Sequence, residues 1–556
     1  MEFSKVVLSS LIWCPIIGAL IVAFLPRRVA REGAFVVALC NLLFALHLPS
    51  HWASGALTQF AENGDIAAGL PFGYRLGVDG LSMPMVLLTA FMTPLVLLLS
   101  WNAFRERDKA AFALLLLLEA AVIGVFCARD LILFYIFFEA TLIPTYLLIA
   151  GWGGVNRNRA ALKFFLYTML GSILMLVAMI YVFAHQTGPN PSFEYEAMRA
   201  AANNLEAGPG APLTTWLFAA FCLAFAVKSP LFPFHTWLPD TYAEAPTPAT
   251  VMLAAVLSKM GVYGFIRFAL PLFPRAAQEA APLLMGLAVV GIIYGAFVAI
   301  AQTDIKRVLA YSSLSHIGFI LLGVFAASAM AGEAGASRTS LPSALSATAL
   351  SGATLQMVSH ALTTGALFLL AGLLFERRAT NAASATNESD ARQVRDFGGL
   401  AGVMPRYTVF FWFALFASIG LPGLCNFVGE YLILQGTMNY GGTGSGLGAG
   451  FLYAALAGTT VIWGAVYMLK MFREAFFGEP RDVNAQLPDM KLFGRESVAL
   501  AVLLALALVI GLMPNAFLSL INPDAQAMVG HYQAVPNQIA AAPTHRSQIA
   551  DLPPAP

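Results

Sequence analysis

The most constraining feature of this sequence is its succession of apolar stretches, each of about 20 residues, separated by short polar segments. An α-helix needs this length to cross the roughly 30 Å hydrocarbon core of a bilayer. Lipid offers the backbone no hydrogen-bond partners, so only helices and closed barrels can cross it. The sequence predicts an all-α polytopic membrane protein of about fourteen helices, starting near residues 6, 34, 80, 111, 131, 161, 213, 246, 282, 307, 347, 404, 450 and 497.

Composition supports this class and argues against others. Hydrophobic residues make up 59% and charged residues 11% of the chain, whereas soluble domains carry roughly 25% charged residues. A net charge of +1 provides no basic face for a nucleic acid. The five cysteines lie singly in apolar segments, so we expect no metal or iron–sulfur site. The first apolar stretch lacks a cleavage site and is expected to remain as the first helix.

Lysine and arginine concentrate in alternate loops, and positively charged loops stay on the cytoplasmic side of a membrane. This bias predicts that both termini lie on the non-cytoplasmic side, given an even number of helices. The predicted cytoplasmic face collects Arg27, Arg28, Arg31, Arg105, Arg107, Lys109, Arg157, Arg159, Lys306, Arg307, the cations between Arg377 and Arg406, and those between Arg473 and Arg495.

Ionisable residues inside the predicted helices are the candidate functional residues. A charge at the bilayer centre costs about 2.5 to 3.5 kcal/mol on insertion scales, so these residues must face one another or water. We expect them to form a buried polar axis. They are Glu119, Glu139, Lys228, Lys259, His316, His360 and Glu430.

Proline interrupts the predicted helix that carries Lys228. Pro230 has no N–H and frees the carbonyl of Ala226 one turn earlier. A break exposed to lipid would be too costly, so a protein-walled, partly hydrated cavity is expected beside Lys228.

A second break lies ahead of Glu430, at Gly420 and Pro422. Paired broken helices point to an inverted-repeat transporter with its ion path at the breaks. We expect five-helix repeats at residues 111–268 and 282–475. The other expected parts are helices 1 to 3 in residues 1–110, helix 14 in residues 497–518 and a flexible tail in residues 523–556.

Structural roles remain open for some of these residues. His316 and His360 could be satisfied core histidines, and Glu119 could be part of a structural pair. Glu139 and Lys228 favour function more strongly, because either one alone would be hard to stabilise in the membrane.

Four stretches resemble one known family, the antiporter-like subunits of respiratory complex I (the proton-pumping NADH:quinone oxidoreductase) and the related Mrp-type cation/proton antiporters. These stretches are KSPLFPFHTWLPDTYAEAPTPATVMLAAVLSKMGVYGFIR at 228–267, GVDGLSMPMVLLTAF at 77–91, FFEATLIPTYLLI at 137–149 and NFVGEYLIL at 426–434. The resemblance extends from the third to the thirteenth predicted helix. Loops at 329–346 and 379–392 look longer than in the family.

The resemblance implies a role for each residue. Glu139 and Lys228 would be an ion pair whose opening and closing transmits the coupling signal, and Lys259 would be the central relay.

In the later helices, His316 and His360 would be bridging groups and Glu430 the terminal site towards the outer face. Glu119 matches a further acidic position. Most antiporter-like chains of the family carry lysine where Glu430 stands, so this glutamate favours the one chain type that has it.

The family implies a proton-translocating subunit of NADH:quinone oxidoreductase in the bacterial inner membrane, moving H⁺ from the cytoplasm to the outer side. Both termini would be periplasmic. No cofactor is expected in this chain, since redox chemistry would belong to other subunits. The expected partners in a hetero-oligomer are two related antiporter-like chains and the lateral helix of one of them, with lipid around the assembly.

Two functional alternatives stay open at this point. A Mrp-type subunit would exchange Na⁺ or K⁺ for H⁺, and a membrane subunit of a hydrogenase-type complex would serve a different redox partner. A purely structural scaffold would not need so many ionisable groups in the bilayer.

Overall fold

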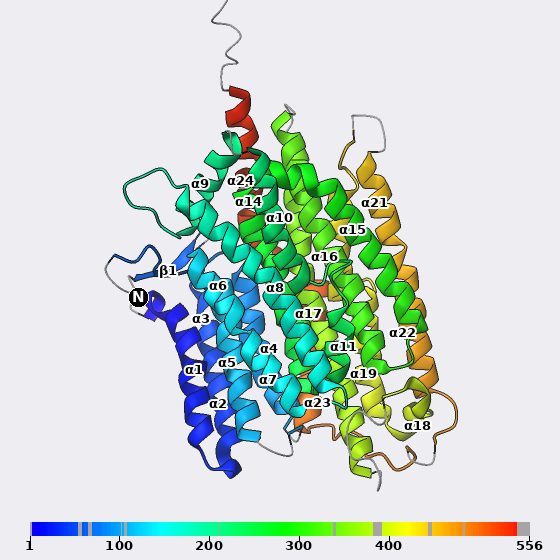
Figure 1. The fold of residues 1–556 in the computed structure, drawn as a ribbon. Helices are drawn as coiled ribbons and strands as arrows, with labels where there is room; N and C mark the ends of the chain where they lie inside the picture. The colour runs from blue at the N-terminus through cyan, green and yellow to red at the C-terminus, as the bar shows by residue number, and fades with distance from the viewer. Residues whose placement is uncertain are drawn as a thin grey trace, which may run out of the picture.

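A computed structural model describes residues 3–53, 58–64, 69–101, 103–104, 108–208, 211–336, 341–381, 392–442, 448–481 and 484–541. Figure 1 shows helices standing side by side in one bundle, with α1 and α2 at one edge and α21 and α22 at the opposite edge. Eleven helical segments among the described residues are long and apolar enough to cross a membrane. The predicted all-α membrane class is confirmed, while the number of fourteen crossings stays a prediction.

The N-terminal half begins with a short 3₁₀ turn and contains the only described strands. Its elements are η1 (Phe3–Lys5), α1 (Val7–Phe24), α2 (Arg27–Ala45), α3 (His47–Ser50), the antiparallel pair β1 (Gln59–Gly64) and β2 (Tyr74–Val78), α4 (Met83–Leu99), α5 (Asp108–Cys127), α6 (Leu131–Ala140), α7 (Leu142–Trp152), α8 (Arg157–Ala184), α9 (Tyr195–Ala207), α10 (Ala211–Lys228) and α11 (Trp237–Glu244).

The next span changes helix type repeatedly, and the later helices are longer. In chain order these elements are α12 (Thr247–Met252), the π-helical η2 (Leu253–Leu257), α13 (Ser258–Gly264), the π-helical η3 (Phe265–Ala269), α14 (Leu270–Leu272), α15 (Pro274–Ala301), α16 (Ile305–Ala336), α17 (Leu341–Asn381), the 3₁₀ turn η5 (Val394–Asp396), α18 (Leu400–Val403), α19 (Pro405–Ile419), α20 (Cys425–Thr437), α21 (Ala449–Gly458), α22 (Thr460–Phe476), α23 (Arg495–Leu512) and α24 (Asn515–Ala541).

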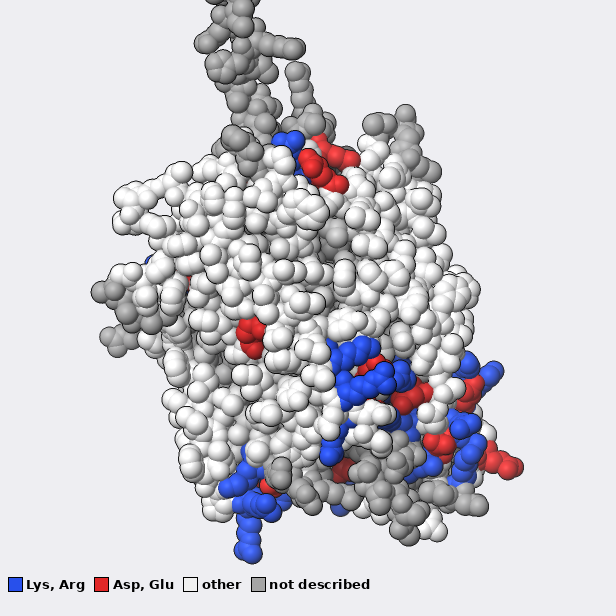
Figure 2. Space-filling model, in the orientation of Figure 1, with Lys and Arg blue, Asp and Glu red and all other residues white. Residues whose placement is uncertain are grey.

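Basic side chains gather towards one end of the bundle. Figure 2 shows them at the lower end, where Figure 1 places the junction of α1 and α2 and the short helix α18. Arg27 and Arg28 are exposed at that junction. Arg105 and Arg107, which were assigned to the same face, lie outside the described residues.

The second helix starts earlier than predicted. It begins at Arg27 rather than near residue 34, a difference of about two turns. An arginine on a helix can extend its side chain to polar surroundings. Charged residues therefore mark the end of an apolar stretch but not the end of the helix.

The connection before α4 holds structure that the apolar pattern does not show. Strands β1 and β2 pair there, and Glu62 of β1 accepts a hydrogen bond from the backbone N–H of Leu8 at 2.7 Å. A carboxylate at this position satisfies the free donors at the N-terminus of α1. The hairpin therefore fixes the entry of the chain into the bundle.

The expectation of a flexible tail from residue 523 is wrong up to residue 541. Helix α24 runs from Asn515 to Ala541 and packs against α16 and α17. Asp524 accepts from the backbone N–H of Gly80 at 2.7 Å, and the Tyr532 hydroxyl donates to the carbonyl of Ile266 at 3.1 Å. Contacts with other helices hold α24 in place. The prediction was wrong because it relied on the polar composition of the segment alone. Residues 542–556 lie outside the described part. Of the two predicted long loops, residues 329–336 belong to α16 and residues 341–346 and 379–381 to α17, so the loop prediction is wrong there, and residues 337–340 and 382–391 lie outside the described part.

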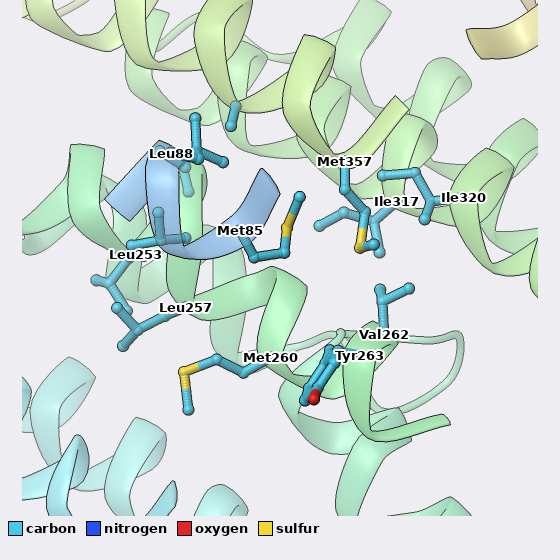
Figure 3. Close-up of a cluster of buried hydrophobic side chains, with 14 of the residues drawn as sticks. Met85, Leu88, Leu253, Leu257, Met260, Val262, Tyr263, Ile317, Ile320 and Met357 are labelled. Carbon is cyan, nitrogen blue, oxygen red and sulfur yellow. The ribbon is translucent and has the colours of Figure 1, made fainter. Parts of the chain in front are cut away.

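Apolar side chains surround the irregular span that carries Lys259. Figure 3 shows a cluster drawn from α4, η2, α13, α16 and α17, with the labelled members Met85, Leu88, Leu253, Leu257, Met260, Val262, Tyr263, Ile317, Ile320 and Met357. These side chains are buried, and Tyr263 is the one labelled member with a polar group. Single-turn π segments such as those on either side of α13 occur frequently at functional sites.

Close packing of α13 against α10 depends on Gly261. A Cβ atom at this position would lie 2.6 Å from both the carbonyl oxygen of Phe225 and the backbone nitrogen of Ser229. No side chain can occupy that space without moving α10 away from α13. Gly261 thus keeps the helices of Lys228 and Lys259 close together.

We predict that Gly261→Ala destabilises the protein by about 1 to 3 kcal/mol, the usual effect of overpacking. Thermal unfolding of the purified protein in detergent measures this change. Gly286→Ala on α15 is the matched control, because a Cβ there meets nothing within 4 Å. Equal unfolding temperatures for the two variants would contradict the prediction.

Candidate functional site

Four ionisable side chains form a connected row through the second half of the bundle. Lys259 Nζ on α13 lies 2.8 Å from His360 Nδ1 on α17. The rings of His360 and of His316 on α16 are 5.5 Å apart between centroids. His316 Nδ1 lies 2.9 Å from Glu430 Oε1 on α20. We call these four residues the central row.

Lys259 begins the central row and is fully buried. Its ammonium group also donates to the carbonyl of Ala254, five residues earlier and inside the π segment η2. The same carbonyl accepts from the Ser258 hydroxyl at 3.0 Å. The irregular helix thus aims a backbone acceptor at the lysine, which reduces the cost of burying its charge.

His360 can relay a proton because its two ring nitrogens face different surroundings. An ammonium group has only donors, so when Lys259 is charged the Nδ1 atom of His360 must accept. The neutral ring then carries its own proton on Nε2, which has no hydrogen-bond partner. Accepting at one nitrogen and releasing from the other is the step that a proton relay requires.

Glu430 ends the central row beside a break between α19 and α20. Its Oε1 atom also accepts from the amide of Gln356 at 3.1 Å. Gly420 sits in the break with φ 84°, and a Cβ there would lie 3.0 Å from Glu430 Oε2. Asn426 donates to the carbonyl of Ser418 at 3.2 Å and so satisfies a backbone group left open by the break. The break both turns the chain and leaves room for the carboxylate.

Lys228 and Glu139 form no ion pair within 4.0 Å in this conformation. Lys228, 2% exposed, donates to the Thr141 hydroxyl at 3.0 Å and lies 4.8 Å from the centre of the Phe138 ring. Glu139 keeps one oxygen, Oε1, buried without a partner. The structure therefore holds the predicted pair apart.

The break after Lys228 satisfies its own backbone groups. The N–H of Leu231 donates to the carbonyl of Ala226 at 2.8 Å, in place of the missing N–H of Pro230. The indole of Trp237 donates to the carbonyl of Val227 at 2.9 Å. The carbonyls of Ala226 and Val227 therefore have protein partners at the break.

A cavity of about 210 Å³ lies where α8, α11 and α16 meet, beyond this break. Lys163 spans its wall, donating to Asp240 at 2.8 Å and to the carbonyl of Thr236 at 2.7 Å. Arg307 donates to the other oxygen of Asp240 at 3.0 Å. Figure 2 shows a group of acidic and basic side chains gathered on the lower right of the molecule. On the side of the break, the cavity is lined by Asp240 and Glu244 of α11, and Lys228 is not among its lining residues.

Glu119 lies apart from the central row. On α5 it is fully buried, and its Oε1 atom accepts from the amide of Asn41 on α2 at 2.8 Å. The structure therefore brings Lys259, His316, His360 and Glu430 together and leaves Glu119 with a neutral partner.

Sequence reasoning missed the neutral partners and one buried cation. Thr141, Gln356 and Asn41 carry no charge, so nothing in an apolar window singles them out. Arg267 is not among the predicted site residues, but it is 4% exposed and pairs with Asp79. Its spacing of eight residues from Lys259, two helical turns, could have placed both on one face.

Among the residues that the structure describes, no three His, Cys, Asp or Glu side chains gather in a way that could hold a metal ion.

Comparison with known families gives a match over most of the chain. The family model described as "NADH:quinone oxidoreductase/Mrp antiporter, TM" matches residues 128–337 and 340–457. NADH-quinone oxidoreductase subunit M of Rhodobacter capsulatus is 38% identical over 544 residues, covering 95% of this chain and 97% of the relative. The subunit M of Mycobacterium tuberculosis is 35% identical over 569 residues, covering 95% of both chains.

Solved structures give the same picture. A chain of respiratory complex I from Thermus thermophilus with bound NADH has a TM-score of 0.78 and 31% identity, covering 94% of this chain and 99% of its own length. A chain of the Mrp complex from Dietzia has a TM-score of 0.76 over 97% of this chain and 100% of its own length. Since that chain is 19% identical, it shows a shared fold alone.

We predict that Gly420→Ala disturbs Glu430 as well as the backbone. A left-handed conformation costs a non-glycine residue roughly 1 to 2 kcal/mol, and the new Cβ would press on Glu430 Oε2 at 3.0 Å. Thermal unfolding should show a larger loss than backbone strain alone explains.

Gly478→Ala separates the two effects, because Gly478 has φ 87° and a Cβ there meets nothing within 4 Å. Adding Glu430→Ala to Gly420→Ala should recover part of the difference. Equal losses in Gly420→Ala and Gly478→Ala would contradict a close approach to the carboxylate.

Proposed function

The chain belongs to the NADH-quinone oxidoreductase subunit M family, and we propose that its buried polar residues carry protons across the membrane, driven by redox chemistry in other subunits. The observation that carries this proposal is the central row, in which Lys259, His360, His316 and Glu430 follow one another from the middle of the bundle to the break after α19. Amines, imidazoles and carboxylates in this order can all take up and release protons.

In the proposed mechanism, Lys228 supplies protons to the central row. A buried ammonium group is tolerated when an anion or an acceptor lies beside it. When Glu139 approaches, Lys228 is stabilised as a cation and takes a proton from the side of the polar cavity. When Glu139 withdraws, as in the conformation described here, Lys228 keeps only the neutral Thr141 hydroxyl and passes its proton to Lys259.

The proton then moves along the central row. His360 receives it on Nδ1 and releases the proton on Nε2 towards His316, and His316 transfers a proton to Glu430. Glu430 releases it to the far side of the membrane. After each transfer, the donor can take up a new proton from the residue before it in the row.

The redox energy comes from outside this chain. The family has no cofactor of its own, so NADH oxidation and quinone reduction belong to other subunits of the complex. Two related antiporter-like chains and the long lateral helix of one of them would be the neighbours in the membrane, and movement at these contacts would bring Glu139 to Lys228 or take it away.

Orientation and repeats complete the proposal. The end of the bundle rich in lysine and arginine faces the cytoplasm of a bacterial cell, and both termini lie on the periplasmic side of the inner membrane. Residues 111–268 and 282–475 are two inverted repeats, each with a broken helix near its ionisable residues. Proton uptake then falls in the first repeat and release in the second.

We predict that Glu139→Gln lowers NADH oxidation and NADH-driven acidification of inverted membrane vesicles together, by about tenfold, which corresponds to about 1.4 kcal/mol of lost coupling. Gln cannot supply the negative charge that recharges Lys228. Glu474→Gln is the control, because Glu474 is exposed near the end of α22 and takes no part in the row. Unchanged rates in an assembled Glu139→Gln complex would argue against the proposal.

We also predict that Lys228→Ala abolishes acidification attributable to this chain. Lys470→Ala provides the comparison, since Lys470 is exposed and donates only to the carbonyl of Ile300 at 3.1 Å. Acidification is followed with a fluorescent pH probe at several sodium concentrations. Full pumping without Lys228 would refute the mechanism, and transport that requires sodium would favour cation exchange.

A further inference from the structure

The hydrogen bonding between Asn41 and Glu119 lacks one donor proton. Both side chains are fully buried, on α2 and α5. The Asn41 amide nitrogen donates to Glu119 Oε1 at 2.8 Å. The other oxygen of each group, Asn41 Oδ1 and Glu119 Oε2, has no hydrogen-bond partner. Two neighbouring groups thus each keep an unsatisfied acceptor in a site without solvent.

A carboxylate cannot resolve this arrangement, because it is only an acceptor. Lipid-facing helices offer no solvent donor either, and an unpaired buried acceptor or charge is costly. A protonated carboxylic acid has one O–H donor. Placed on Oε2, that proton can point to Asn41 Oδ1 and satisfy both unsatisfied oxygens at once.

No charge near Glu119 favours the ionised form. No ion pair within 4.0 Å joins it to a described cation, and Asn41 is hydrogen-bonded to it. The thiols of Cys14 on α1 and Cys40 on α2 are titratable groups nearby. Helix α4 carries no titratable side chain, and no hydrogen bond or ion pair joins Glu119 to a described charged group on the other elements packed against α5, which are α6, α7, α13 and β2.

We propose that Glu119 is a neutral carboxylic acid in this conformation, held by Asn41 in a ring of two hydrogen bonds, N–H to Oε1 and O–H to Oδ1. Asn41 is thereby a positioning residue, and the pair is a protonation site separate from the central row. Release of the proton would leave a carboxylate facing the carbonyl oxygen of Asn41. Loss of the proton would therefore break the O–H bond to Asn41 and weaken the link between α2 and α5.

Infrared spectra of the whole membrane-embedded complex test the proposal. Spectra of wild-type and Glu119→Gln samples are compared at neutral pH, in H₂O and D₂O. We expect the wild type to show a carbonyl stretch of a protonated carboxylic acid that Glu119→Gln lacks. Loss of carboxylate bands alone in Glu119→Gln would overturn the proposal.

The role of Asn41 is tested in the same spectra. Asn41→Leu removes both hydrogen bonds, so the Glu119 carbonyl band should move to the frequency of a free acid. An unshifted band would show that Asn41 does not hold the acid. If Asn41→Leu does not assemble, Asn41→Ser gives the same test, since its short side chain cannot close the ring.

Glu62→Gln is the matched control for a buried carboxylate. Oε1 of Glu62 accepts from the backbone N–H of Leu8 at 2.7 Å, and its Oε2 accepts from that of Ser9 at 3.1 Å, so both oxygens have donors. Its difference spectrum should contain carboxylate bands only. Glutamine at position 119 can also form both bonds of the ring, so Glu119→Gln should assemble and unfold at the wild-type temperature. A large drop in that temperature would contradict a neutral acid at this position.

Discussion

The surrounding lipid offers buried polar groups no hydrogen-bond partner, so a polar group in this bundle is costly unless it bonds within the protein. This constraint explains why the ionisable residues do not stand alone. Lys259 has a backbone carbonyl and an imidazole, Glu430 has an imidazole and an amide, and Lys228 has a hydroxyl and an aromatic face. Amines, imidazoles and carboxylates can each become neutral by taking up or releasing a proton. Side chains of this kind can therefore be buried in the membrane and used there.

The helix irregularities follow from the same constraint. The π segment before α13 directs the carbonyl of Ala254 to Lys259, and the break at Gly420 leaves the space that Glu430 fills. In a regular helix, the carbonyl of Ala254 would be bonded within the helix, and the space at Gly420 would be closed. The chain therefore departs from regular helix geometry where charges must be accommodated, and Trp237 and Asn426 satisfy the carbonyls that are freed.

Sequence reasoning found the charged members of the site but not their partners. An ionisable residue is rare in an apolar stretch, so Lys228, Lys259 and Glu430 stand out. Thr141 and Gln356 do not, because neutral polar residues occur throughout membrane helices and their function depends on a neighbour far away in the chain. Helix α24 was missed for a related reason, since contacts with other helices rather than its own pattern hold it in place.

The arrangement also separates two kinds of polar site. In the central row, Lys259 is hydrogen-bonded to His360 and His316 to Glu430, while the two imidazole rings between these pairs lie 5.5 Å apart. Between Lys228 and Lys259 the described residues show no such direct bond, and Gly261 keeps their helices packed closely. In the proposed mechanism, the central row passes the proton on, and the gap between Lys228 and Lys259 prevents its return. Movement of Glu139 would control transfer across this gap, and a rigid chain of bonds without a gap would lack that control.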